Sequence, residues 1–342
     1  MSGKLPWNSP ADVPCVTGPG DLKSFERVPL HDLLCTALCV FCLFTGFRSL
    51  AIRFVLDPFS TRMVGRGSYN HATHQKFIQA AWRAVVHATA TGYALSFLFL
   101  GGSELTFLSN TTLFWKDWPH QEVSSYEREG MFSLYALYIG MYAHHLVLIA
   151  VDLVGDDYLA LVAHHVTTLS IVLGSWCAGF TRVGACTMVL HDCSDVLLEF
   201  AKCFNYVKKY NPKYGIGADF CFGGFAVSFF YLRLYVLPRT TVYSSVAEAC
   251  GLTTCFEADR GLDTWTNCAT VSAWRFFTAG LLLLQALQVL WAVKIVQVLI
   301  NVATGKELSD VREVDHEDAK DVGEARPMDE NVPNGHRRGK QE

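Results

Sequence analysis

Charge is scarce in this sequence. Of its 342 residues, 18% are Asp, Glu, Lys or Arg, and 51% are hydrophobic; a soluble domain has about 25% charged residues. Lys and Arg number 28 against 32 Asp and Glu, and this lack of basic excess excludes a nucleic-acid-binding protein, which needs a basic face. The hydrophobic content excludes a disordered chain except at the ends. The composition therefore predicts an integral membrane protein.

Several motifs of soluble enzymes are missing. There is no GxGxxG or GxxxxGK[ST] loop for nucleotides, no HExxH zinc motif and no GxSxG hydrolase motif. The chain has 12 cysteines, but no two CxxC pairs stand at zinc-finger spacing. Cys250, Cys255 and Cys268 fall in one segment between two apolar runs. Two of these three can form a disulfide in an oxidising compartment, and the sequence leaves the choice open.

Seven segments are long enough to cross a bilayer, which takes about 20 mostly apolar residues. The first and last of them are the most hydrophobic, and residues 182–206 are the least, because ionisable side chains recur in them. We therefore predict an all-α integral membrane protein with about seven transmembrane helices. The predicted spans are residues 31–55, 78–100, 132–154, 158–178, 182–206, 220–237 and 274–302.

Basic residues favour one orientation, with the N-terminus in the lumen and the C-terminus in the cytosol. This orientation puts Lys208 and Lys209 in a cytosolic loop, whereas omitting the span 182–206 would move them to the lumen. Residues 1–30 then form a lumenal arm, and residues 304–342, which are polar and acidic, form a disordered cytosolic tail. The sequon at Asn110 faces the lumen, so Asn110 is a predicted glycosylation site.

Ionisable residues within the spans are concentrated between residues 156 and 206. Each costs on the order of 2.5–3.5 kcal/mol inside a bilayer, so each needs a partner or a function. His164 and His165 lie ~8–9 Å inside the cytosolic end of their helix, at 1.5 Å per residue. The next helix carries a polar face formed, at spacings of i, i+4, i+8 and i+11, by His191, Asp195, Glu199 and Lys202, with Asp192 beside it.

This polar group has three interpretations. Imidazoles titrate near neutrality, so paired histidines with nearby carboxylates suit proton transfer or nucleophilic attack. The same residues can instead form a structural network that satisfies two bent helices. Stripes of His and Asp also line proton and ion pathways, which would need openings on both sides of the membrane.

The same region resembles the ceramide synthase family. HHVTTLSIVLGSW followed by FTRVGACTMVLHDCSDVLLEFAKCFNY is similar to the family signature within the TLC domain, and KFIQAAWRAVVHATATGYAL and LQVLWAVKIVQVL resemble its first and last segments. The resemblance covers about two thirds of the chain. Two positions depart from the family pattern: Gly179 stands where Asn is usual, and residues 153–156 replace a basic run.

The resemblance implies a TLC domain at residues 76–303, with six helices around a lipid tunnel. It implies transfer of a fatty acyl group from acyl-CoA to the amine of a sphingoid base in the endoplasmic reticulum membrane. Fatty acyl-CoA is then a co-substrate, and neither a bound cofactor nor a metal is expected. The expected partners are these two substrates and membrane lipids, with a homodimer or heterodimer as a further option. The alternative is a non-catalytic TLC protein that senses lipids or accompanies a translocon.

Each polar residue takes an expected role in that reaction. His164 is the preferred group to attack the thioester or to act as general base, and His191 or Asp195 takes a proton from the amine. Asp192 is expected to orient His191. The predicted catalytic residues are His164, His165, His191, Asp192 and Asp195. The predicted substrate-binding residues are Arg83, Asp157, Ser194, Glu199, Lys202 and Arg233. A further pair, His144 and His145, is interpreted as structural because no carboxylate stands near it at helical spacing.

Overall fold

The structure is a computed structural model that describes residues 30–64, 70–100, 110–115, 118, 125–152, 158–249 and 272–304. All regular elements within these ranges are helices, so the predicted all-α fold is confirmed for the part described. The predicted N-terminal arm and acidic tail lie outside these ranges except for a residue at the edge of each. Four predicted site residues also lie outside them: Asp157, Cys250, Cys255 and Cys268.

The first half of the chain forms two long rods. The first is α1 (Leu30–Ala51), which continues through the π-helical turn η2 (Ile52–Leu56) into α2 (Asp57–Val64). The second is α3 (His71–Leu95), which continues into η3 (Ser96–Leu100). Asn70 begins α3 because its side chain accepts a 2.9 Å hydrogen bond from the N–H of Ala72, the usual role of an N-cap.

The chain continues with a short 3-10 turn, η5 (Thr111–Phe114), and four further long helices. These are α4 (Ser125–Asp152), α5 (Tyr158–Ala178), α6 (Thr181–Lys208) and α10 (Ser272–Ala303). Between α6 and α10, one continuous helical rod is built from η6 (Pro212–Tyr214), α7 (Gly215–Phe229), η7 (Phe230–Val236), η8 (Pro238–Val242) and η9 (Ser244–Glu248).

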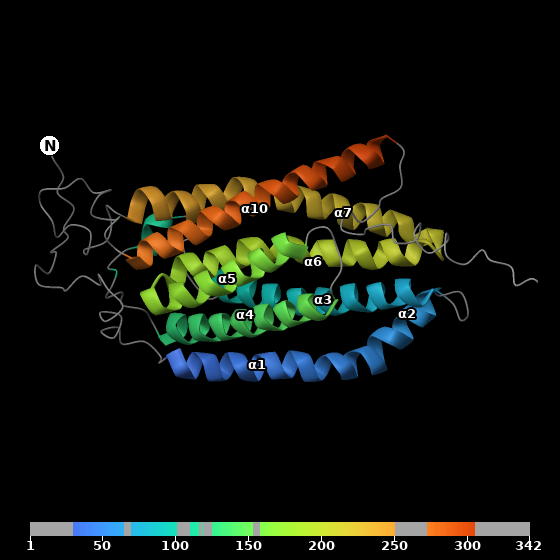
Figure 1. Ribbon diagram of the computed structural model, residues 1–342, viewed down its shortest axis with the longest axis horizontal. Coiled ribbons are helices and arrows are strands. Elements are labelled where there is room, and N and C mark those ends of the chain that lie inside the picture. The colour runs from blue at the N-terminus through green and yellow to red at the C-terminus, as the bar shows by residue number, and fades with distance from the viewer. Residues whose placement is uncertain are drawn as a thin grey trace, which may run out of the picture.

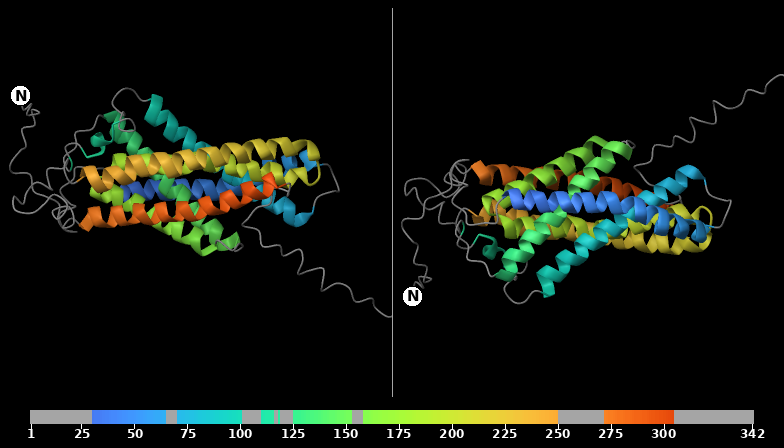
Figure 2. Two further views of the ribbon diagram at one scale, coloured as in Figure 1. Left: turned by 90° about the horizontal axis from the view of Figure 1, so that it is seen from above. Right: turned by 90° about the horizontal axis from the view of Figure 1, so that it is seen from below.

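The rods run side by side along the long axis of the molecule (Figures 1 and 2). α3 and α6 lie in the middle and pack along each other, α7 packs on α6, and α1 packs on α4. α5 contacts both α4 and α10. Figure 1 shows α1 on one outer side of the bundle and α7 and α10 on the opposite side. The polar helix α6 is therefore enclosed by its neighbours.

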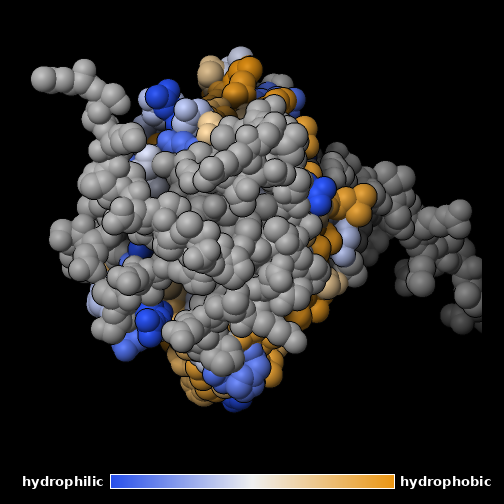
Figure 3. Space-filling view, turned by 90° about the vertical axis from the view of Figure 1, so that its left-hand side faces the viewer, coloured by the Kyte–Doolittle hydropathy of each residue, from blue (hydrophilic) through white to orange (hydrophobic). Residues whose placement is uncertain are grey.

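Five helical segments of the described part are long and apolar enough to span a membrane: Leu30–Met63, Tyr126–Val151, Tyr158–Ala178, Pro212–Glu248 and Ala273–Ala303. Large apolar side chains point outward from them, among them Leu43, Ile216 and Phe220, as expected for surfaces that face lipid. Hydrophobic residues also show along the edges of the end-on view (Figure 3). The protein is thus a multi-pass membrane protein.

The two remaining predicted spans correspond to α3 and α6, which do not meet the apolar criterion. The polar side chains that these helices bury, such as His87 and Asp192, face inward, so hydropathy underestimates how well α3 and α6 fit a membrane. The predicted count of seven spans is therefore confirmed for five segments and stays a prediction for α3 and α6.

One predicted boundary is wrong. The predicted span 220–237 ends too early, because the helix continues past Pro238 to Ala249. Wider π-helical turns on both sides of Pro238 accommodate the missing N–H. The extension is held by indole hydrogen bonds: Trp115 donates to Ser244 Oγ (2.8 Å), and Trp274 donates to the carbonyl of Ser245 (2.7 Å).

The turn between α5 and α6 depends on Gly179, whose φ of 84° lies in the left-handed region. The N–H of Phe180 bonds to the carbonyl of Ser175 and that of Gly179 to Trp176, the pattern of a Schellman ending. We expect Gly179→Ala to destabilise the fold by about 1–2 kcal/mol, because a Cβ is strained at positive φ. Gly179→Asn should cost less, since Asn tolerates this region. Thermal unfolding in detergent measures both variants, and an alanine variant as stable as the wild type would contradict the expectation.

Asn110, the predicted glycosylation site, is exposed. Its Oδ1 accepts hydrogen bonds from the Oγ1 (2.6 Å) and the N–H (3.3 Å) of Thr112, the third residue of its sequon. Neighbouring Leu113 binds Arg182 at the start of α6, so Asn110 lies at the end of the bundle predicted to be lumenal. Glycosidase treatment of protein from eukaryotic membranes should increase its gel mobility, and Asn110→Gln should abolish the shift. A wild-type band that does not move would contradict the predicted orientation.

Candidate functional site

Helix α6 carries most of the candidate site. His191, Asp192, Glu199 and Lys202 are all at least nine-tenths buried, although such side chains are rarely buried without partners. The predicted polar face is thus confirmed as an inward-facing one. α3 packs along one side of α6, and α7 with η7 packs along another, so α6 presents polar groups to two neighbours at once.

Three of the predicted catalytic histidines lie next to one another. The ring of His164 on α5 has its centroid 5.9 Å from that of His191 on α6 and 5.4 Å from that of His165. Trp291 on α10 meets His164 edge-on, with centroids 5.1 Å apart. Two adjacent helices thus bring imidazoles together beside an aromatic wall, as the sequence predicted.

Hydrogen bonds fix which nitrogen of two of these rings carries a proton. Nδ1 of His191 lies 2.8 Å from the carbonyl of Thr187, and Nδ1 of His165 lies 3.1 Å from the carbonyl of Leu161. A carbonyl only accepts, so Nδ1 is the donor in both rings and Nε2 holds the lone pair of the neutral form. Nε2 of His191 is buried and has no hydrogen-bond partner among the described residues. His191 therefore presents a basic nitrogen within the bundle.

Asp192 does not orient His191, so this prediction is wrong. Its carboxylate turns instead to α3, where Oδ1 lies 2.5 Å from Nδ1 of His87 and Oδ2 accepts a 2.9 Å hydrogen bond from Thr91. The orienting partner of His191 is the carbonyl of Thr187. The cause is the helix geometry: consecutive residues point about 100° apart, so Asp192 faces α3 while His191 faces α5.

Arg233, on η7, forms the centre of a second polar group. Its guanidinium lies 2.7 Å from Asp195 Oδ2, donates to the carbonyl of His191, and donates a 3.2 Å hydrogen bond to Gln288 of α10. Arg233 is buried, and a quarter of the Asp195 side chain is exposed. The predicted substrate-binding residue Arg233 is therefore paired with a predicted catalytic carboxylate, and it ties η7, α6 and α10 together.

Glu199 joins α3 to α6 further along the bundle. It accepts a 3.1 Å hydrogen bond from Nε of Arg83 and a 2.8 Å hydrogen bond from Nζ of Lys202. Lys202, predicted to bind substrate, is buried and folds back on Glu199. Two cations thus share one carboxylate here.

The two histidines of the second pair, His144 and His145, have different surroundings. His144 is structural, as predicted: it accepts a 2.9 Å hydrogen bond from the indole of Trp82 and contacts Thr45 Oγ1 at 3.1 Å. His145 differs, because its ring lies 4.7 Å from that of His87 and 6.2 Å from that of His165. The structural interpretation of His145 rested on missing carboxylates in its own helix, whereas its neighbours come from other helices.

His87 is the residue that sequence reasoning missed. It lies on α3 and is nine-tenths buried, in a stretch whose only other ionisable neighbour in sequence is Arg83. The available signal was its position inside a predicted span, where an ionisable residue is a functional candidate by default. Ser194, predicted to bind substrate, is fully buried on α6, and its Oγ has no hydrogen-bond partner among the described residues.

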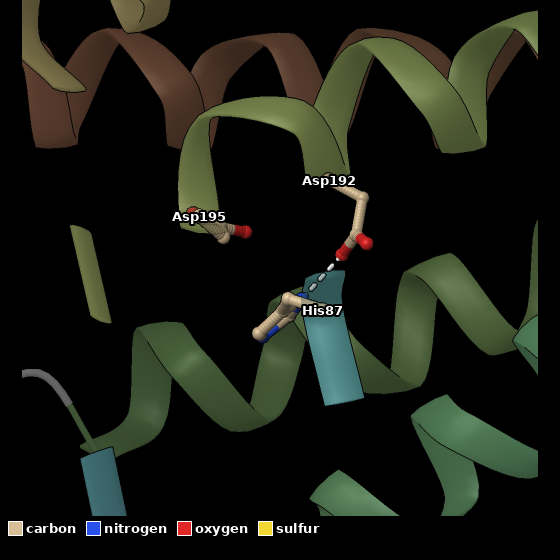
Figure 4. A group of neighbouring side chains, drawn as sticks. All are labelled: His87, Asp192 and Asp195. Carbon is tan, nitrogen blue, oxygen red and sulfur yellow. Dashed lines mark hydrogen bonds and ion pairs between the residues drawn. The ribbon is translucent and has the colours of Figure 1, made fainter. Parts of the chain in front are cut away.

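One group in the described part has the composition of a metal site. His87, Asp192 and Asp195 each offer a ligand atom, and these atoms lie within 4.8 Å of one another. Figure 4 shows the two carboxylates on α6 directed toward His87 on α3. However, Asp192 is already bonded to His87, and Asp195 to Arg233, so a cation would have to displace both contacts. The expectation that no metal is bound stays a prediction.

The lipid tunnel also stays a prediction. The described residues form an open apolar groove of about 570 Å³ on the outer side of α7 and η7, at Phe220, Gly224, Val227 and Tyr231. This groove lies on the other side of α7 from the histidines and faces outward, so it is not the predicted tunnel.

The region of the sequence that carries the site also matches known proteins. The TLC domain family matches residues 76–297. "Ceramide synthase 4" of Mus musculus is 28% identical over 272 residues, 77% of this chain and 61% of that protein. "Ceramide synthase 1" of Homo sapiens is 28% identical over 259 residues, 72% and 67% of the two chains, and "Ceramide synthase LOH2" of Arabidopsis thaliana is 27% identical over 214 residues, 60% and 68%. The matched region is about three fifths of the length of the mouse relative. Since the family match covers well over half of the sequence and contains all the histidines of the site, the chain belongs to the TLC domain family.

Proposed function

We propose that this protein is a ceramide synthase, which transfers a fatty acyl group from acyl-CoA to the amine of a sphingoid base. The observation that carries the proposal is the contact between His164, His165 and His191 inside a membrane bundle. The names of the relatives support the same reaction. Both substrates are amphipathic, with apolar chains that fit between helices and polar groups that do not, so a polar site within the bundle suits them.

The first step is attack on the thioester. We assign this attack to a nitrogen of His164, because His164 lies between the other two histidines. The C–N bond to the imidazole forms, the C–S bond breaks, and the coenzyme leaves as a thiolate. The proton lost by the acylated imidazole neutralises the thiolate, with Nε2 of His191 or His165 as the intermediate carrier. In the direct alternative, His164 acts only as a base and no acyl-histidine forms.

The second step is attack by the amine, which arrives mostly as an ammonium ion. Nε2 of His191 is suited to take its proton, because the bond from Nδ1 to Thr187 fixes the tautomer that leaves Nε2 basic. Asp195 is the other candidate, although its carboxylate already pairs with Arg233. The neutral amine then attacks the acyl carbon, the amide C–N bond forms, and the acyl–imidazole C–N bond breaks. The second proton lost by the amine nitrogen goes to the imidazole of His164, which is thereby restored.

The remaining polar residues suit the coenzyme. Arg83 and Lys202, two cationic side chains, both pair with Glu199. They lie toward the end of the bundle where α6 ends, which the sequence predicts to be cytosolic. We place the phosphates of acyl-CoA at this end. We also propose an endoplasmic reticulum location, with the N-terminus in the lumen and the C-terminus in the cytosol, and assembly as a homodimer or heterodimer.

The test is to incubate membranes that contain the protein with acyl-CoA and labelled sphinganine. The proposal expects labelled dihydroceramide from the wild type, and little from variants of His164 or Asp195. Membranes from cells without endogenous activity are the control. A wild-type protein that forms no amide, or two variants that retain full activity, would exclude the enzyme and favour a non-catalytic lipid-binding role.

A further inference from the structure

The proposed reaction leaves one buried group of polar residues without a role. His87, Thr91 and Asp192 form it between α3 and α6, with His145 of α4 beside them. The ring centroids of His87 and His145 are 4.7 Å apart. The group lies on the α3 side of α6, whereas His191 faces α5.

Asp192 differs from the other two carboxylates of α6 in what balances its charge. Asp195 pairs with Arg233, and Glu199 pairs with Arg83 and Lys202. The partners of Asp192 are Thr91, which is neutral, and His87. A carboxylate that is 1% exposed is stabilised by a compensating charge, and His87 supplies one when it takes up a second proton. The arrangement thus creates a place for one proton at His87.

The orientation of His87 directs that proton toward the reaction site. Because Nδ1 of His87 donates to the Asp192 carboxylate, the nitrogen that gains a proton is Nε2. Figure 4 shows this second nitrogen pointing away from Asp192. His145 is the nearest imidazole to His87, and its Nε2 is buried with no hydrogen-bond partner among the described residues. His145 can therefore accept a proton from one neighbour and pass it to another.

Imidazoles connect this group to the proposed site of acyl transfer. From His87, ring centroids follow at 4.7 Å to His145, 6.2 Å to His165 and 5.4 Å to His164. A ring rotation or a single bridging water spans such separations. The series links α3, α4 and α5.

A metal ion fits the same group less well. Two ligands of a tetrahedral zinc ion with bonds of about 2.0 Å are separated by roughly 3.3 Å, whereas His87 and Asp192 are only 2.5 Å apart. The guanidinium of Arg233 beside Asp195 also repels a cation. The geometry is that of a hydrogen bond, which holds a proton rather than a metal.

We infer that His87 stores the proton released by acylation, reached through His145 and stabilised by Asp192. The inference rests on the proposed function. Before the amide C–N bond forms, the ammonium proton passes to an imidazole at the reaction site, and from there through His165 and His145 to Nε2 of His87. The result is an imidazolium paired with the Asp192 carboxylate, and the proton returns to solvent before the next cycle. His87 and Asp192 are positioning residues for this proton, since neither touches the reacting atoms.

The test compares His87→Gln with His144→Gln in the ceramide assay across pH 6 to 9. Glutamine can still donate to Asp192, but its amide cannot take up a proton. We expect kcat of the His87 variant to fall at least tenfold, less than the about 10²–10⁴-fold typical of a direct general base. KM for acyl-CoA should not change. Its residual rate should rise with pH, because solvent must then accept the proton. His144, which is buried and bonded to Trp82, is the matched control and should retain the wild-type profile.

A change in the pH profile of the His87 variant can be assigned to His87 itself. The ionisable groups acting on it are Asp192, Asp195 and Glu199 of α6 and His145 of α4, and all four remain in the variant. Asp192→Asn is a second variant that keeps the hydrogen bonds and removes the charge, and it should show the same pH dependence. Thermal unfolding of each variant reports folding.

The outcomes separate the two proposals. Wild-type kcat and pH profile in both His87→Gln and Asp192→Asn would overturn the proton-storage inference and leave the acyltransferase intact. An activity loss that is equal at every pH and accompanied by a lower unfolding temperature would assign a structural role and also overturn it. A wild-type protein that forms no ceramide would overturn both.

Discussion

Replacing His164 by alanine is expected to lower the rate of ceramide formation by about 10²–10⁴-fold, the usual contribution of a nucleophile or general base. The reason is its position: His164 lies between His165 and His191, and its ring meets Trp291 on α10. No other side chain of the described part makes ring contacts with both His165 and His191. The measurement is the initial rate of amide formation in membranes, normalised to the amount of folded protein.

The control for His164→Ala is His71→Ala, which removes an exposed imidazole at the start of α3 and should leave the rate unchanged. Pre-steady-state release of free CoA separates the two chemical routes. A burst before the amine is added, present in the wild type and absent in His164→Ala, supports the acyl-histidine. No burst, together with an impaired variant, supports direct transfer with His164 as base. A His164 variant within twofold of the wild-type rate would contradict any role for this residue in the chemistry.

Properties of a single helix could be predicted from the sequence. Helices α1, α5 and α10 follow from long apolar runs, and the bounds predicted for the fourth span, 158–178, coincide with those of α5. The inward face of α6 follows from the spacing of its ionisable residues, because a charged stripe can only face the interior of a membrane bundle. The convergence of His164 and His191 follows from a short turn that makes α5 and α6 antiparallel neighbours.

Contacts between helices distant in sequence could not be predicted in this way. His87 and Asp192 are 105 positions apart, and the periodicity of each helix says nothing about which neighbour it faces. The same limit explains Asp192, whose partner was sought on its own helix, and His145, which was judged by the carboxylates near it in sequence. Arg233 was predicted to bind substrate, and its pairing with Asp195 depends on how η7 packs against α6.

The continuation of the helix beyond Pro238 also depends on residues that are distant in sequence. Proline normally ends a helix because it lacks an N–H, and the sequence pattern therefore favours a loop. Hydrogen bonds from Trp115 and Trp274 to Ser244 and Ser245 hold the following turns in place. These tryptophans come from segments more than 25 residues away on either side, so a local interpretation of the sequence does not include them.

Arg233→Met is expected to produce the largest loss of stability among the single substitutions considered, about 3 kcal/mol. Breaking a buried ion pair costs about 3–5 kcal/mol because the remaining charge is left uncompensated, and the partial exposure of Asp195 places the loss at the lower end of this range. The substitution also removes the donor that binds the carbonyl of His191 and the side chain of Gln288. Since this carbonyl belongs to a predicted catalytic residue, activity should fall with stability.

The second substitution that tests this account is Asp195→Asn in the Arg233→Met background. A neutral amide is cheaper to bury than a carboxylate, so the double variant should recover part of the lost stability, although Asp195 then no longer serves as a base and activity should remain low. Arg62→Met removes an exposed arginine of α2 and should change the stability by less than about 0.5 kcal/mol. The free energy of unfolding in detergent micelles, measured by denaturant titration, compares the four proteins. An Arg233 variant as stable as the wild type, or a double variant less stable than the single one, would show that the pair with Asp195 does not hold η7 against α6.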